Sequence, residues 1–230
     1  MRVLVACEES QVVCKAFRER GHEAYSCDIM ECSGGHPEWH IQGDVLEILN
    51  PVPLFGTDKK GIAFHTCDGE FHGFVGKWDL IVAHPPCTYL TNAGTRQYSF
   101  KMNPPEKVYA RMALREEAAD FFMRFVNADC DKIAIENPVG IMTRYYKKAD
   151  QYVQPLQFGH PTSKKTGLWL KGLPLLKPTN IVEPVIIHCK SGVNEPRWHM
   201  ETMHLLKEER SRVRSQTFIG IAKAMADQWV

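Results

Sequence analysis

The feature that most constrains the fold is a short apolar run, Leu80 to Ala83, which stops at His84-Pro85-Pro86-Cys87. Short apolar runs ended by turn residues are typical of buried strands in parallel sheets. Proline cannot donate to a strand ladder and restricts the residue before it, so the chain must leave the sheet here. In an open α/β sheet this exit lies at the carboxyl edge, where ligands bind. The sequence therefore predicts that Cys87 lies at a ligand-binding edge.

The first residues of the chain read as a strand, a helix and a second strand that ends in an acid. Arg2 to Cys7 is an apolar strand, and Val12 to Arg20 has the spacing of a helix, with Ser10 as its expected N-cap. Glu23 to Cys27 is the next apolar run and leads directly to Asp28. This order is typical of a nucleotide-binding βαβ unit, whose acid accepts hydrogen bonds from ribose hydroxyls. The glycine-rich turn of such units is missing.

The remaining chain continues the alternation of strands and helices. Residues 105–127 have the strongest helical spacing, and an apolar strand before Glu136 again stops at a proline. Residues 50–77 are rich in glycine and proline and predict an insertion, whereas residues 171–205 lack a clear period. We therefore expect one α/β domain over residues 1–230, with a mostly parallel sheet of about seven strands flanked by helices.

The composition is that of an ordinary soluble chain, with 44% hydrophobic and 24% charged residues. No apolar run reaches the ~18 residues that a membrane span needs. The formal charge of +1 gives no global argument for nucleic acid binding, so local basic clusters must supply it. The eight cysteines are unevenly spaced and the chain starts without a long apolar signal region, which favours a reducing cytoplasm.

Two predicted strand ends place an ionisable group beside proline: Cys87 follows Pro86, and Glu136 precedes Asn137-Pro138. A deprotonated thiol is a strong nucleophile. Burial can raise the pKa of a carboxyl group until it donates a proton near neutral pH. Together the two groups suit a reaction in which sulfur attacks an electron-poor ring while a ring nitrogen is protonated. Taken separately, they also fit a buried structural thiol and a surface glutamate.

Five segments resemble, in family order, the motifs of the DNA cytosine carbon-5 methyltransferases, and more narrowly the short members found in phages and prophages. These segments are RVLVACEES, HPPCT, IENP, FGHPTSKKTGLWLKG and QTFIGIAKAMADQW. The resemblance implies a Rossmann-like S-adenosylmethionine-dependent methyltransferase fold. It also implies S-adenosylmethionine as the cofactor and DNA as the substrate, in the cytoplasm of a bacterial or phage-infected cell.

The resemblance assigns roles to individual residues. It implies that Cys87 attacks carbon 6 of cytosine, that Glu136 contacts ring nitrogen 3, and that carbon 5 takes a methyl group. The target base would be flipped out of a duplex or presented in single-stranded DNA. The residues expected to bind the cofactor are Cys7, Glu8, Glu9, Ser10, Gln11, Asp28, Ile29, Asp44 and Pro85. The residues expected to bind the substrate are His84, Pro86, Thr88, Asn137, Pro138 and Lys164, with Arg96 and Lys101 from a basic cluster.

The sequence departs from the family pattern at several places. Acidic and polar residues replace the glycines of the first motif, and His84 replaces a glycine ahead of Pro-Pro-Cys. Lys164 and Thr166 stand where two arginines are usual, and lysine lacks the bidentate fork of arginine. Only residues 171–205 remain as a reduced target-recognition segment, so sequence recognition could come from a partner.

Three other functions remain open. The His84-Pro85-Pro86 turn could serve methylation of an exocyclic base amine, although Cys87 follows it and the aromatic Tyr89 comes late. The near-neutral charge and the short recognition segment would allow a free nucleotide as the substrate. The missing glycines would allow a non-catalytic relative that binds nucleic acid, which calorimetric titration with S-adenosylmethionine would distinguish from the enzymes.

Basic residues cluster at 96–111, 144–148 and 207–214. The first two clusters follow the two proline-marked strand ends and alternate with aromatic residues, which suits phosphates and an exposed base. The third contains interleaved acids and fits a solvated helix face at least as well. Two sets of residues have zinc-ligand types but lack a CxxC pair, so we expect no metal; they are Cys27, Cys32, His36 and His40, and His65, Cys67 and His72.

Overall fold

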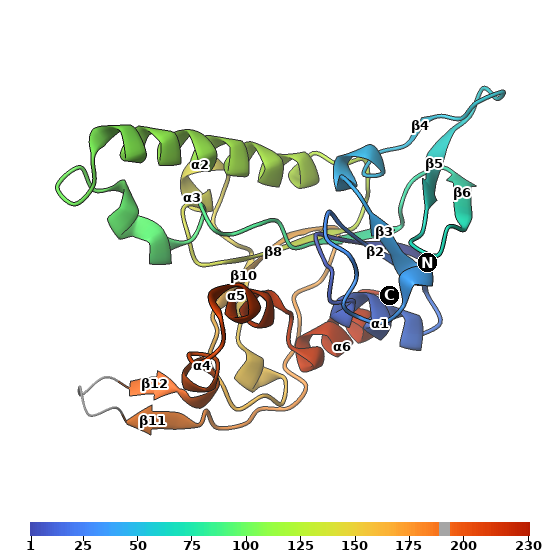
Figure 1. The fold of residues 1–230 in the computed structure, drawn as a ribbon. Helices are drawn as coiled ribbons and strands as arrows, with labels where there is room; N and C mark the ends of the chain where they lie inside the picture. Colours follow the sequence, from blue (N-terminus) through green and yellow to red (C-terminus); the bar gives the residue numbers. More distant parts are fainter. Residues whose placement is uncertain (189–193) are drawn as a thin grey trace.

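The computed structural model describes residues 1–188 and 194–230. Its centre is a seven-stranded sheet with the strand order β3-β2-β1-β7-β8-β10-β9 (Figure 1). The strands are β1 (Arg2–Ala6), β2 (Glu23–Asp28), β3 (His40–Gln42), β7 (Leu80–Ala83), β8 (Ile133–Pro138), β9 (Gln151–Val153) and β10 (Thr166–Lys171). The first five of these run parallel, and β10 runs antiparallel to both β8 and β9. The predicted architecture, an α/β fold with a mostly parallel seven-stranded sheet flanked by helices, is confirmed.

Helices cover both faces of this sheet. They are α1 (Val12–Glu19), α2 (Pro105–Val126), α3 (Met142–Tyr145), α4 (Arg197–Glu201), α5 (Lys207–Ser215) and α6 (Ile219–Gln228). Figure 1 shows α2 on one side of the sheet and α1 with α6 on the other. Among the described residues, no helix is both long and apolar enough to cross a lipid bilayer.

The strands are apolar along their whole length because both faces are buried. In β1, Leu4 and Ala6 belong to the core under α2, whereas Val3 and Val5 belong to the core under α1 and α6. Successive side chains of a strand point to opposite faces, so a strand with helices on both sides needs apolar residues at every position. This explains why the run at Leu80–Ala83 contains no polar residue.

The apolar face of α2 is narrower than the sequence predicts. Phe122 and Phe125 are fully buried, as expected, but the side chains of Met112 and Leu114 are 42% and 38% exposed. In Figure 1 the first half of α2 extends beyond the central sheet, and Met112 and Leu114 do not belong to the core between the sheet and α2. A short 3-10 helix, η3 (Asn92–Tyr98), packs against this half of α2.

Two smaller elements lie at the ends of the molecule. The glycine- and proline-rich stretch forms an antiparallel sheet of β4 (Val52–Pro53), β5 (Lys60–His65) and β6 (Phe71–Val75). The aperiodic stretch contains the pair β11 (Ile186–His188) and β12 (Asn194–Pro196), followed by α4. Part of the predicted recognition segment, residues 189–193, lies outside the described residues.

Candidate functional site

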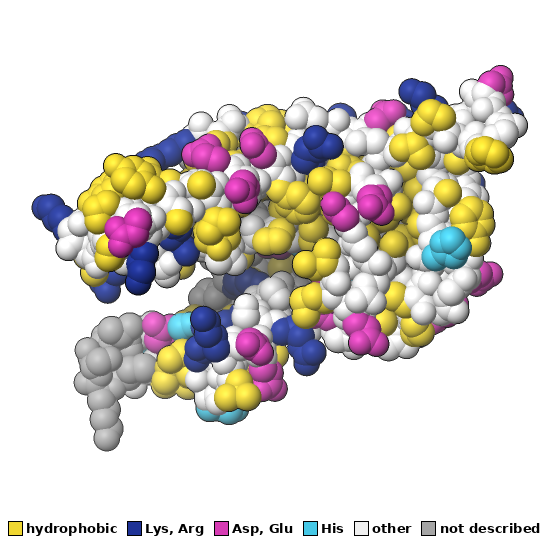
Figure 2. All heavy atoms as spheres, turned by 45° about the horizontal axis from the view of Figure 1, so that its top comes forward, with side chains coloured by type: hydrophobic (Ala, Val, Ile, Leu, Met, Phe, Trp, Pro, Cys, Tyr) yellow, Lys and Arg dark blue, Asp and Glu magenta, His cyan; other side chains and the backbone are white. Residues whose placement is uncertain are grey.

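A cleft of about 470 Å³ opens at the carboxyl edge of the sheet. Its lining comes from the β1–α1 turn, the ends of β2, β7 and β8, the residue two places before β10, and α5 with the segment that leads to α6. In the space-filling view a hollow opens between the part that carries α2 and the part that carries α4 and α5, and lysine and arginine side chains border it (Figure 2).

The cleft brings together most of the residues predicted from the sequence. Both proposed catalytic residues, Cys87 and Glu136, line it. The predicted cofactor residues in its lining are Cys7, Glu8, Glu9, Ser10, Asp28 and Pro85. The predicted substrate residues in its lining are His84, Pro86, Thr88, Asn137, Pro138 and Lys164.

Five predicted site residues are not part of the cleft lining: Gln11, Ile29, Asp44, Arg96 and Lys101. Gln11 is fully buried, and its side-chain amide bonds the backbone of His36 in both directions, so its role is structural. The Asp44 carboxylate accepts a hydrogen bond from the N–H of Leu46 at 2.9 Å and caps a 3-10 helix, η2 (Val45–Glu47). Ile29, Arg96 and Lys101 are exposed, and the last two lie on or just after η3.

The β1–α1 turn keeps the backbone shape of a glycine-rich turn without its glycines. Cys7 and Gln11 have φ angles of 59° and 57°, in the left-handed region that glycine favours. The sequence predicted Ser10 as the N-cap of α1, and this prediction is wrong. Gln11 occupies the N-cap position and makes no side-chain capping bond. Instead, the buried carboxylate of Glu8 accepts hydrogen bonds from the N–H groups of Val13 and Cys14.

The loops after β7 and β8 are held tightly together. The Asn137 side-chain amide donates to the carbonyl of Pro85 at 2.7 Å, and the N–H of Ile141 donates to the carbonyl of Leu90 at 2.9 Å. Gly140 makes this approach possible, because a Cβ there would lie 2.0 Å from the Leu90 carbonyl oxygen. The position of Cys87, between these contacts, is therefore fixed by both strands.

Glu136 forms an ion pair with His84, whose Nδ1 lies 3.0 Å from the carboxylate Oε2. Burial acts to raise the pKa of Glu136, but the hydrogen bond and charge of His84, together with the charge of Lys164, outweigh it and bring the pKa below its usual range. The sequence-based expectation of a raised pKa at Glu136 is therefore wrong. The Glu136 carboxyl group is therefore ionised at neutral pH, because hydrogen bonding and nearby positive charge outweigh its burial.

Cys87 is half-buried and has a protonated thiol at neutral pH. Burial and the nearby charge of Glu136 raise the pKa of the thiol, and the charge of Lys164 only partly offsets them. A thiol in this state needs a base before it can act as a nucleophile. The ionised Glu136 carboxylate lines the same cleft.

The acidic end of the cleft suits S-adenosylmethionine, which carries a sulfonium and an ammonium group. Asp28 ends β2, and one of its carboxylate oxygens accepts a hydrogen bond from the N–H of Met30 at 3.0 Å. Glu8 and Glu9 lie across from it in the β1–α1 turn. Burial raises the pKa of Asp28, so a ligand that donates hydrogen bonds or carries positive charge would relieve an unfavourable environment. The Asp28 carboxylate, as a hydrogen-bond acceptor, therefore fits a group of this cofactor that donates hydrogen bonds.

The sequence did not predict that α5 and the residues after it line one side of the cleft. The lining residues from this region are Glu208, Ser211, Arg212, Arg214, Ser215, Gln216 and Thr217. Arg214 is held by the carbonyl of His199 and the hydroxyl of Thr202, whereas Arg212 is exposed and makes no side-chain bond to the described residues. Arginines alternate with other residues along α5, and this pattern indicates a basic surface. That this surface faces the cleft is shown only by the fold.

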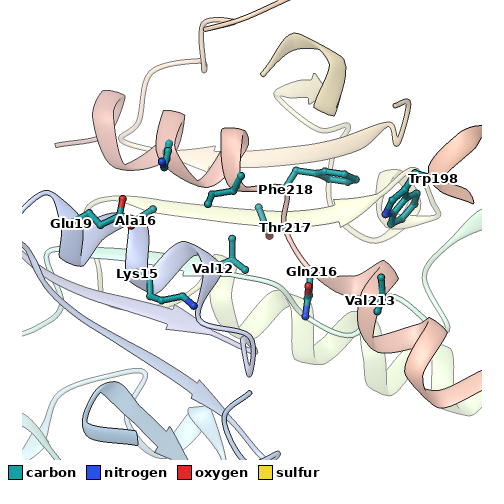
Figure 3. A pocket seen from close by; sticks show the side chains of 11 residues that line it. Val12, Lys15, Ala16, Glu19, Trp198, Val213, Gln216, Thr217 and Phe218 are labelled. Carbon is teal, nitrogen blue, oxygen red and sulfur yellow. The ribbon is translucent and has the colours of Figure 1, made fainter. Parts of the chain in front are cut away.

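A second hollow, of about 340 Å³, adjoins the cleft at Gln216 and Thr217, which line both. It lies between α1 and α6, with Trp198 of α4 at one end (Figure 3). The Trp198 and Phe218 rings are 5.3 Å apart. The lining of this hollow combines apolar side chains with the charged residues Lys15, Glu19 and Lys223.

The candidate zinc residues have other partners. Both ring nitrogens of His40 are hydrogen-bonded, to the Ser26 hydroxyl and the Met30 carbonyl, and both of His72 are bonded to Tyr25 and Thr66. Within residues 1–188 and 194–230, no group of three or more His, Cys, Asp or Glu side chains is placed to hold a metal ion.

Comparisons of this chain with known proteins add little to what the geometry of the cleft shows. No protein-family profile matches the sequence, and no curated protein matches it. One similar solved structure is the methyltransferase EhMeth of Entamoeba histolytica, with 12% identity and a TM-score of 0.42. The match covers 81% of this chain and 58% of that chain, so this chain spans less than two thirds of that protein.

Proposed function

We propose that this protein is an S-adenosylmethionine-dependent methyltransferase that modifies carbon 5 of cytosine in DNA through a covalent adduct of Cys87. The observation that carries the proposal is the meeting of Cys87 and Glu136 in one cleft with Asp28 and the β1–α1 turn. A nucleophile, a carboxylate and a site suited to the cofactor are the parts that this reaction requires.

The side chains in the cleft can carry the proton transfers of adduct formation. The ionised Glu136 takes the proton from the Cys87 thiol, and the sulfur then bonds to carbon 6 of the ring. The electron pair of the carbon 5–carbon 6 double bond moves towards ring nitrogen 3, which takes the proton from Glu136. No net proton is gained or lost, because the proton that leaves sulfur ends on the ring. S-adenosylmethionine, when bound, would supply the methyl group for carbon 5.

Arginine and lysine side chains near the cleft support a nucleic acid substrate. Arg212 lines the cleft from α5, and η3, which carries Arg96 and is followed by Lys101, packs against α2 on the other side of the hollow. Exposed cations on two sides of a cleft suit the phosphates that flank a target base. The target base would have to be flipped out or single-stranded to reach Cys87.

Covalent trapping on DNA that contains 5-fluorocytosine tests the proposal. Fluorine blocks the elimination step, so the wild-type protein should form a stable adduct when S-adenosylmethionine is added. Cys87→Ala should form none, whereas Cys67→Ala, which removes an exposed thiol outside the cleft, should behave as the wild type. Equal methylation by the wild type and Cys87→Ala would overturn the proposal.

Two further measurements separate the alternative functions. Mass spectrometry of digested DNA distinguishes 5-methylcytosine from a methylated exocyclic amine. Calorimetric titration with S-adenosylmethionine distinguishes an enzyme from a non-catalytic relative, since the absence of binding at millimolar concentration would exclude methyl transfer.

A further inference from the structure

We propose that His84 is a positioning residue for Glu136: it holds one carboxylate oxygen, so that the other oxygen is left to exchange a proton with Cys87 and the ring. This inference rests on the proposed function, whose chemistry requires Glu136 to act first as a base.

Strand register places the two residues together. β7 and β8 are neighbouring parallel strands in which Ala83 is paired with Ile135, so the next residues, His84 and Glu136, emerge side by side at the carboxyl edge. The His84 Nδ1 lies 3.0 Å from the Glu136 Oε2, and the two side chains are only 10% and 16% exposed. A contact set by register and shielded from water is stronger and better oriented than a surface ion pair.

The hydrogen-bonding capacity of the pair fixes the arrangement of protons. An ionised carboxylate only accepts hydrogen bonds, so the Nδ1 of His84 carries the hydrogen of this bond. The Nε2 of His84 is buried and has no partner among the described residues. His84 therefore makes one directed contact, and that contact is with Glu136.

The surroundings explain why the carboxylate needs this partner. Lys164, before β10, acts on Glu136, and Glu136 in turn acts on Cys87. The other titratable residues of the cleft lining are Cys7, Glu8, Glu9, Asp28, Glu208, Arg212 and Arg214. The charge of His84 acts on Glu8 as well as on Glu136. Without His84, only Lys164 and Thr166 would oppose the effect of burial, so the pKa of Glu136 should rise and less of it should be ionised to take a proton from the thiol.

A direct titration tests the inference without any need for catalysis. The carbon-13 signal of the Glu136 carboxyl group, identified by its loss in Glu136→Gln, should titrate at a higher pH in His84→Asn and His84→Ala than in the wild type. The asparagine side chain retains a donor near the Nδ1 position without the charge, so the shift should be smaller in His84→Asn than in His84→Ala. An unchanged titration in both variants would overturn the inference, whether or not the protein methylates DNA.

The rate of adduct formation supplies the functional test. A rise of one unit in the Glu136 pKa lowers the ionised fraction about tenfold well below that pKa. Adduct formation by His84→Ala should therefore be slowed most at low pH and should approach the wild-type rate as the pH rises. A loss that is the same at every pH would show a merely structural role and would contradict the inference. His36→Gln, outside the cleft, is the control, and circular dichroism checks that each variant folds.

If the wild type forms no adduct but the carboxyl titration shifts as expected, the proposed function fails and the assignment of His84 stands. If the adduct forms but the titration is unchanged, the proposed function stands and the assignment of His84 fails. The two results are therefore distinguishable.

Discussion

The carboxylate of Glu8 accepts a hydrogen bond from the backbone N–H of Val13 at 2.7 Å, and its other oxygen accepts one from Cys14 at 3.1 Å. The start of α1 is thus closed by an acid from the preceding turn. Two N–H groups at a helix start otherwise lack partners, and an acid there is also favoured by the helix dipole. The burial of Glu8 raises its pKa, so the same side chain is costly to keep ionised.

Replacing Glu8 should destabilise the protein. Glu8→Ala removes the acceptor for two buried N–H groups, and we expect a loss of about 1–2 kcal/mol in the free energy of unfolding, the range for a lost helix cap. Glu8→Gln retains one acceptor and should lose less. Denaturant unfolding measures both, and Glu117→Ala, at an exposed site of α2, is the control. Equal stability of Glu8→Ala and Glu117→Ala would show that the cap contributes nothing.

Gly34→Ala should disturb the β1–α1 turn. A Cβ at residue 34 would lie 2.5 Å from the Cβ of Gln11 and 2.7 Å from the Ser10 carbonyl oxygen. Overpacking of this kind typically costs about 1–3 kcal/mol, so we expect a loss of that size together with weaker S-adenosylmethionine binding. Gly43→Ala is the matched control, because its Cβ would meet nothing within 4 Å. Thermal unfolding and calorimetry would detect the difference.

Asp28→Asn should separate stability from cofactor binding. Because the folded-state pKa of Asp28 is raised above the unfolded value of 3.8, its ionised form destabilises the fold at pH values above the folded pKa. Asparagine should therefore raise the melting temperature at neutral pH, and the gain should vanish as the pH falls to 3.8 and below. S-adenosylmethionine binding should weaken at the same time, as calorimetry would show. A lower melting temperature at neutral pH would contradict this reasoning.

The ionised form of Glu136 should stabilise the fold, whereas the ionised form of Asp28 should destabilise it. Its folded-state pKa is depressed below 4.5, so its contribution is fully present above pH 4.5 and is lost as the pH falls through the folded pKa. Glu136→Gln should thus be less stable than the wild type at neutral pH, and the two proteins should converge in acid. Urea unfolding at a series of pH values measures this difference. A constant difference across the series would mean that the ion pair with His84 does not cause it.

Arg212→Ala should weaken DNA binding through electrostatics alone. If Arg212 contacts one phosphate, its removal should lower the slope of log affinity against log salt by about 1, and the loss should be similar for different sequences. Fluorescence anisotropy with short oligonucleotides at several salt concentrations is the measurement. Lys60→Ala, an exposed cation on β5 away from the cleft, should leave the slope unchanged.

Patterns that depend on burial are readable from the sequence. The strand at Leu80–Ala83 is predicted to the residue because a strand buried on both faces must be apolar throughout and must end where proline follows. The meeting of Cys87 and Glu136 follows from the same reasoning, since both strands end at one edge. The three-residue edge strand Gln151–Val153 has too few residues to show a period.

Features that depend on exact register or backbone conformation are not readable in this way. The contact between His84 and Glu136 needs the pairing of β7 with β8, which no local pattern specifies. The Glu8 cap requires Gln11 to take a left-handed conformation, against its ordinary preference. The place of Arg212 depends on how α5 packs on the rest of the chain.

Because β10 runs antiparallel to β8, its first residues, not its last, lie at the carboxyl edge of the sheet beside the cleft. β10 begins where β8 ends, because Thr166 pairs with Pro138, and Lys164 just ahead of it bonds the last turn of α5. The connection from β9 to β10 therefore reaches the cleft at its end, through Lys164, whereas Phe158 earlier in the connection is buried in the core. For engineering, substitutions at Lys164 offer a way to change what the cleft admits without redesigning the sheet.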